Sequence, residues 1–133
     1  MKNKHIDTYT TVYPVYLVVA NEAVTLEDLK KDFVYSDKNE LDEDVLDCQC
    51  STSKVYNKKT NRYCMLVKFN HRTDYKDDDK TTDLINTAAH EAGHVVLDIY
   101  DFIGASVDIN NQEPFTYELG YIAECIYKTL IKK

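Results

Sequence analysis

Apolar and polar positions alternate along parts of the first half of the chain, which predicts strands there. Residues 11–20 are rich in Val and Tyr and predict a strand, with an edge or a bulge near Pro14. Residues 53–56 and 62–70 flank a turn-rich stretch at 57–61, so this part predicts a β-hairpin. The second arm alternates in the manner of a half-buried strand.

The second half of the chain has the spacing of two amphipathic helices. The first is predicted over about residues 83–103, capped by Thr82 or Asp83 and ended by Gly104. Its expected core stripe is Ile85, Ala89, Ala92, Val96, Ile99 and Ile103. The second is predicted over about residues 111–131, with Asn111 as the N-cap and Pro114 in the first turn. Its expected stripe is Phe115, Leu119, Ile122, Ile126 and Leu130.

A short helix and an acidic segment separate the predicted strand from the hairpin. Thr25 and Asp28 form a capping box that opens a helix through about Phe33. Residues 36–47 are acidic and predict an exposed loop or a short helical turn. The order strand–helix–hairpin–helix–helix indicates one α+β domain over residues 1–133, with a strand–helix portion at 1–52 and the hairpin and long helices at 53–133. A short antiparallel or mixed sheet should pack on the two long helices.

Composition excludes several classes of function. The chain has 133 residues, 44% of them hydrophobic, and a formal net charge of −7, so it lacks the basic surface of a nucleic-acid-binding protein. No apolar run reaches 18 residues, so no membrane span is expected. Residues 12–20, after Lys2 and Lys4, faintly suggest a signal peptide but are too short, and we interpret them as a buried strand.

Four cysteines, Cys48, Cys50, Cys64 and Cys125, leave two readings open. Free thiols in a reducing, cytoplasmic compartment are the first expectation. Cys48 and Cys50 could join Cys64 in a thiolate metal site, although no fourth ligand has a recognisable spacing, and a Cys50–Cys64 disulfide could close the hairpin in a secreted protein.

The most specific chemical signal is the HExxH motif His90-Glu91-Ala92-Gly93-His94. Positions i and i+4 of a helix lie on one face, so His90 and His94 can bind one metal ion while Glu91 reaches a metal-bound water. The pair lies beside the predicted core stripe, in the row that continues to Leu97 and Asp101. Glycine inside a helix costs about 1 kcal/mol; Gly93 is therefore expected where another backbone approaches closely.

A catalytic zinc ion needs three protein ligands and one open position. Glu113, in the first turn of the last helix, is the expected third ligand, because a short loop can fold that helix back against the motif helix. Asp108, Glu118 and Glu124 are the alternatives.

HEAGH at 90–94 and EPFTY at 113–117 resemble the short gluzincin-type zinc peptidases, including the ImmA/IrrE-like group, over residues 53–130. The resemblance implies zinc held by His90, His94 and Glu113, Glu91 as general base, and a protein or peptide substrate held along an edge strand above the motif helix, a place expected for 62–70. Tyr117, or Tyr121 one turn on, would donate to the oxyanion. Asp98 and Asp101 could orient a ligand histidine, or are ordinary surface acids.

Two readings compete with a peptidase. A non-catalytic zincin-fold binding or structural protein, of phage or mobile-element origin, fits so compact a chain, and a metal-free α+β interaction domain could carry the motif by accident. Residues 74–80 read DYKDDDK, close to a FLAG epitope, and are interpreted as a solvated charge run without chemistry.

Overall fold

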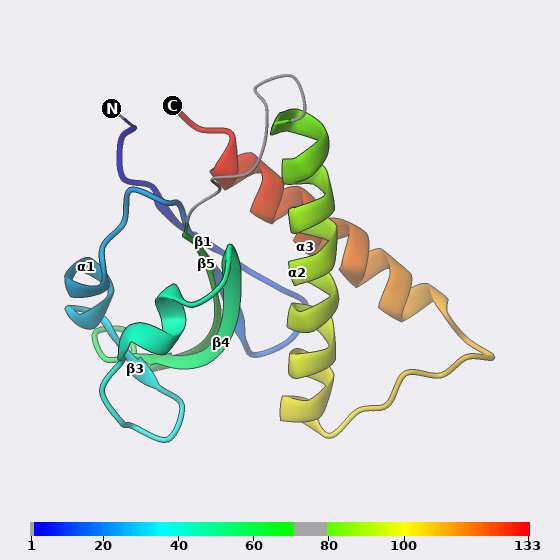
Figure 1. Ribbon diagram of the computed structural model, residues 1–133. Helices are drawn as coiled ribbons and strands as arrows, with labels where there is room; N and C mark the ends of the chain where they lie inside the picture. Colours follow the sequence, from blue (N-terminus) through cyan, green and yellow to red (C-terminus); the bar gives the residue numbers. More distant parts are fainter. Residues whose placement is uncertain (1, 71–79) are drawn as a thin grey trace.

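The computed structural model describes residues 2–70 and 80–133 (Figure 1). The charge run at 74–80 lies outside this part of the chain except for Lys80, which begins a helix. The elements in chain order are β1 (Ile6–Tyr9), β2 (Tyr16–Ala20), α1 (Leu26–Lys30), β3 (Phe33–Tyr35), the 3-10 helix η1 (Glu43–Leu46), β4 (Cys50–Asn57), β5 (Arg62–Phe69), α2 (Lys80–Ile103) and α3 (Glu113–Leu130).

The described strands form one mixed sheet in the order β1-β2-β5-β4-β3. Only the β2–β5 pair is parallel within it; the other neighbours are antiparallel. This confirms the predicted α+β class and the hairpin, and the sheet unites strands from both predicted portions of the chain. Strands β1 and β3 were not predicted, because four and three residues are too few to establish an alternation.

The prediction that residues 62–70 form an edge strand is wrong. Residues 62–69 form β5, which lies between β2 and β4 in the interior of the sheet. Six successive residues, Cys64–Phe69, are buried, as expected for a strand covered on both faces and paired on both sides. Among the described residues β1 and β3 are the edge strands, and the first part of β4 also lacks a neighbouring strand on one side, because β3 pairs with its last part at Val55–Asn57.

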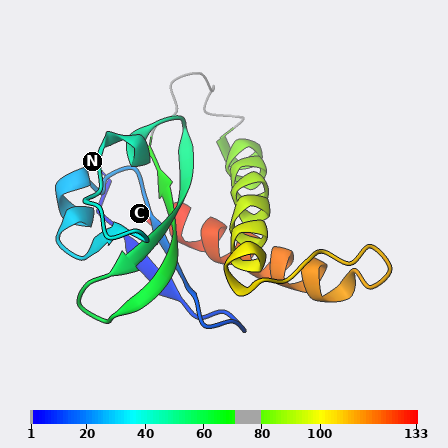
Figure 2. The ribbon, with the colours of Figure 1, turned by 90° about the horizontal axis from the view of Figure 1, so that it is seen from below.

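Figure 2 shows the two long helices on one side of the sheet and α1 on the other, and an apolar layer lies on each side. On one face Met65, Val67 and Phe69 of β5 pack with α2 and α3. On the other face Cys64 and Leu66 pack with the segments that carry α1, β3 and η1. The expectation of a sheet packed on the motif helix and the C-terminal helix is therefore confirmed.

Helix α2 begins three residues earlier than predicted. Ala92, Val96 and Ile99 of its predicted stripe are buried, but the rest of the buried face differs from the prediction. Leu84, Ala88 and Val95 are buried, whereas Ile85 is 56% exposed and Ala89 is also exposed. Because α2 touches both the sheet and α3, its buried arc is centred nearer the sheet than the apolar spacing alone indicates. The row of His90, His94, Leu97 and Asp101, which was predicted to lie beside the core stripe, is exposed.

Helix α3 starts two residues after the predicted N-cap and ends close to the predicted end. Ile122, Ile126 and Leu130 of its predicted stripe are buried, while Phe115 and Leu119 are partly buried. The capping box of Thr25 and Asp28 is present at α1. Across the described residues, neither long helix combines the length and apolarity that a membrane crossing requires.

Candidate functional site

The two motif histidines converge on the exposed side of α2. Their Nε2 atoms lie 3.2 Å apart, and their ring centroids 4.9 Å apart. Two nitrogens bound to one tetrahedral zinc ion at 2.0–2.1 Å would be about 3.3 Å apart. The separation equally fits a hydrogen bond between one protonated and one unprotonated nitrogen. The pair is thus already arranged to share one proton or one cation.

Glu91 points the other way, toward the sheet. It is 5% exposed, and its Oε2 accepts a hydrogen bond of 2.6 Å from the Thr52 hydroxyl on β4. Thr52 faces α2 because strand residues alternate between faces, and Lys54, two residues on, likewise reaches Asp101 of α2 at 2.8 Å. Glu91 therefore lies at the contact between β4 and α2. His90 and His94 lie on the exposed side of the same helix.

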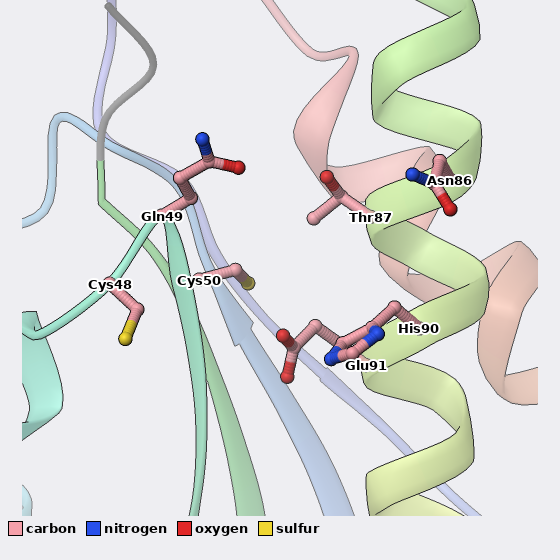
Figure 3. A pocket seen from close by; sticks show the side chains of 7 residues that line it. All are labelled: Cys48, Gln49, Cys50, Asn86, Thr87, His90 and Glu91. Carbon is pink, nitrogen blue, oxygen red and sulfur yellow. The ribbon is translucent and has the colours of Figure 1, made fainter.

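A cleft of about 400 Å³ separates α2 from the start of β4 and η1. Histidine, cysteine and carboxylate side chains supply most of its lining, which consists of Asp44, Asp47, Cys48, Cys50, Ser51, Thr52, His90, Glu91, His94 and Asp98. A neighbouring hollow of about 320 Å³ extends it along α2 to Asn86 and Thr87. Figure 3 shows the Cys50 thiol reaching from the strand toward α2 and the Glu91 carboxylate reaching back.

Within residues 2–70 and 80–133, no strand pairs with the first part of β4 on the side away from β5. The Lys54 carbonyl accepts from the Ser36 N–H, so residue 54 directs its backbone groups away from β5. Residues two apart in an antiparallel strand direct these groups to the same side. Thr52 consequently points its N–H and C=O to the same side, where pairing with β3 has ended at Val55. An extended chain could add to the sheet at this position.

The charges along the cleft are mainly negative. Burial raises the pKa of the Asp98 carboxyl, an effect that the positive charges of Lys54 and His94 oppose. The pKa of Asp101 is lowered by its hydrogen bond to Lys54. Asp101 is thus tied to the strand, and Asp98 is the one of these two acids that lines the cleft.

Neither Glu113 nor Tyr117 reaches the cleft. Both are exposed on the first turns of α3, Tyr117 by 75%. The ring of Phe115 packs on Tyr100, with 5.9 Å between centroids, and Tyr100 lies about 120° around α2 and roughly 9 Å along it from His94. The start of α3 is therefore attached to a different side of α2, beyond the motif (Figure 1).

Within residues 2–70 and 80–133, no three histidine, cysteine or carboxylate side chains are grouped closely enough to hold a metal ion. The structure accordingly does not bring Glu113 together with His90 and His94.

The alternative metal ligands and the alternative oxyanion donor also lie away from the two motif histidines. Asp108 is exposed and accepts from the N–H of Asn110 in its own turn. Glu118 is buried with one carboxylate oxygen lacking a hydrogen-bond partner, and Glu124 pairs with Lys128. The Tyr121 hydroxyl donates to the carbonyl of Thr10 at 2.7 Å, which places it at the loop between β1 and β2.

None of the four cysteines forms a disulfide. Cys50 and Cys64 contribute to the layers on opposite faces of the sheet, so the hairpin disulfide considered from the sequence does not form. Cys48 and Cys50 both line the cleft, whereas Cys64 does not. The CxC spacing drew attention to this pair, but their position opposite the histidines depends on pairing between β4 and β5 and could not be predicted.

Thr52 was missed altogether, because its partner Glu91 lies 39 residues away and a lone threonine in a strand carries no signal. Comparison of the chain with known protein families, with curated proteins and with solved structures finds no match. The geometry of the cleft therefore has to support any functional assignment.

Proposed function

We propose that the protein is a small zinc-dependent metallopeptidase of the zincin type, acting in the cleft between β4 and α2. The observation that carries the proposal is the 3.2 Å separation of the Nε2 atoms of His90 and His94, beside the carboxylate of Glu91. Two convergent imidazoles, a general base and an open strand edge are parts of a metal centre that hydrolyses a peptide, which also needs a third protein ligand.

The donor set fits zinc at two positions. Imidazole nitrogen is a ligand that zinc prefers, and the separation of the two nitrogens matches tetrahedral coordination. Bound zinc would supply a water of lowered pKa and polarise the scissile carbonyl. Glu113 and Tyr117, which the family resemblance implies as ligand and oxyanion donor, take no part in the proposal, since α3 holds them elsewhere.

The residues of the chain would share the remaining work. The open backbone of Thr52 would hold an extended substrate antiparallel to β4. Glu91, fixed by Thr52 through one carboxylate oxygen, would use the carboxylate to take a proton from the attacking water and return it to the leaving amine. Burial at the strand–helix contact keeps this group in place before the substrate arrives.

A second candidate is a non-catalytic metal-binding or structural protein. The hydrogen bond between Thr52 and Glu91 favours it, because that bond gives Glu91 a role in stability independent of catalysis. Zinc held by His90 and His94 would then stabilise α2 without turnover.

Metal analysis combined with one substitution separates the two candidates. We expect about one zinc ion per purified chain, and Glu91→Gln to keep that zinc. On a library of extended peptides, we expect Glu91→Gln to reduce hydrolysis by about 100-fold or more, since a general base is removed. Equal hydrolysis by wild type and variant would overturn the proposed mechanism. Zinc binding without hydrolysis by either protein would establish the second candidate.

A further inference from the structure

The proposed metal centre lacks a third ligand in the place where the family resemblance puts it, and the cleft offers a different one. Cys50 begins β4 and lines both the cleft and the hollow beside it, as His90 and Glu91 do. We propose that the Cys50 thiolate, and not the Glu113 carboxylate, completes the metal site of His90 and His94. This inference rests on the proposed function, because it assigns the third ligand of the metal ion proposed there.

Strand alternation directs Cys50 toward the motif. Cys50 and Thr52 are two residues apart and therefore face the same side of the sheet. Thr52 contacts Glu91, so Cys50 lies one step along the strand from that contact, opposite the turn of α2 that carries Thr87 and His90. Figure 3 shows its sulfur in the gap between strand and helix, on the side to which the Glu91 carboxylate projects.

The adjacent cysteine occupies a different position. Cys48 precedes the strand, has a backbone φ of 64° and is exposed. In Figure 3 it lies on the far wall of the hollow, with Cys50 between it and α2. The two thiols of the CxC pair thus differ in place, although their chemistry is the same, and Cys48 serves as the matched control for Cys50.

Zinc favours the resulting donor set. Two imidazoles and one thiolate are nitrogen and sulfur ligands of the kind that zinc binds, and they leave a fourth position for water or substrate. On binding, the S–H bond of Cys50 breaks, a sulfur–metal bond forms and the proton passes to solvent, with no change of oxidation state. As placed, no three such side chains of the described residues are close enough to hold a metal ion, so binding requires His90 and His94, which are exposed on α2, to turn toward the strand.

Cobalt(II) tests the assignment in the full-length, metal-free chain, because a thiolate bound to cobalt gives a sulfur-to-metal charge-transfer band in the near ultraviolet. We expect wild type to bind one cobalt ion with this band. Cys50→Ser should abolish the band and weaken cobalt binding by about tenfold or more, since even the loss of an outer-shell partner costs 10–100-fold. Cys48→Ser, Cys125→Ser and Glu113→Gln should keep both band and affinity.

The outcomes separate this inference from the function on which it rests. Cobalt binding by wild type without the band, or binding that Glu113→Gln weakens and Cys50→Ser leaves intact, overturns the thiolate ligand while the metal centre stands. A band that depends on Cys50, in a protein that hydrolyses no peptide, supports the ligand and rejects the peptidase. Absence of cobalt binding by wild type rejects both. Where Cys50→Ser, a substitution in the core, lowers stability, retention of the wild-type band in Cys48→Ser and Cys125→Ser still assigns it to Cys50, the remaining thiol that lines the cleft.

Discussion

Thr52 on the open strand β4 donates a hydrogen bond of 2.6 Å to Glu91 in the middle of the HExxH motif. A separation this short is typical of a hydroxyl bound to a charged oxygen. The bond joins the first half of β4 to α2 at the point where the cleft opens, and so couples the residue proposed as general base to the strand proposed to hold substrate.

Thr52→Val should lower the free energy of unfolding by about 1–3 kcal/mol, because a buried carboxylate loses its donor while the side-chain volume is kept. Urea denaturation measures the change. Thr52→Ser, which retains the hydroxyl, is the control and should lie much closer to wild type. If the valine variant proves as stable as the serine variant, the hydrogen bond contributes nothing to the fold.

His94→Ala should leave the metal-free protein almost as stable as wild type, within about 0.5 kcal/mol, since the ring is exposed. The stabilisation that zinc gives to wild type should disappear, because a ligand-bound folded state is favoured in proportion to its affinity. Thermal unfolding with and without zinc measures both effects. Leu97→Ala, in the same exposed row of α2, should keep the zinc effect; its loss there would point to a general effect of the helix surface.

The long helices and the hairpin could be predicted because each carries its own periodicity. The position of β5 could not, because parallel pairing with β2 joins segments such as Val19 and Val67 that are far apart in the chain. The spacing argument predicted only part of the face that α2 buries, namely Ala92, Val96 and Ile99. Ile85 and Leu84 are neighbours of similar apolarity, and contact with both sheet and α3 determines which one is buried.

The candidate site likewise has one part that the sequence predicts and one part that depends on the packing of distant segments. The convergence of His90 and His94 follows from helix geometry and is visible in the motif itself. The relation of the motif to other elements depends on packing. Phe115 at the start of α3 packs on Tyr100 of α2, and Glu113 consequently lies away from the histidines. Cys50 lines the same cleft as the histidines because β4 packs beside α2.

Gly93→Ala should stabilise the protein by about 0.5–1 kcal/mol through its effect on helix propensity. The sequence led us to expect a close backbone neighbour at Gly93, but an added Cβ would meet no atom within 4 Å outside the local helix. Thermal unfolding measures the gain, and zinc binding should be unchanged. Destabilisation by alanine would indicate a neighbour that this fold does not contain.

Glu118 provides a pH-dependent prediction remote from the cleft. It is 6% exposed, its Oε1 has no hydrogen-bond partner, and burial raises the pKa of its carboxyl above 4.5. Between the unfolded and the folded pKa, the folded state binds more protons than the unfolded state, so stability falls as pH rises through this interval. Below pH 4.5 the group is neutral in both states, and above the folded pKa the full cost of a buried charge remains.

Glu118→Gln removes that charge at nearly constant volume and should therefore raise the melting temperature at neutral pH. Each 1 kcal/mol corresponds to roughly 4 °C for a chain of this size. The difference from wild type should shrink as pH falls and vanish below the ordinary glutamate pKa, because Glu118 is then neutral as well. Glu124→Gln is the matched control on the same helix, since Glu124 is exposed and pairs with Lys128, and it should change the melting temperature little at any pH. A glutamine variant that is less stable than wild type at neutral pH would mean that the Glu118 carboxylate has a cationic or hydrogen-bonding partner in solution.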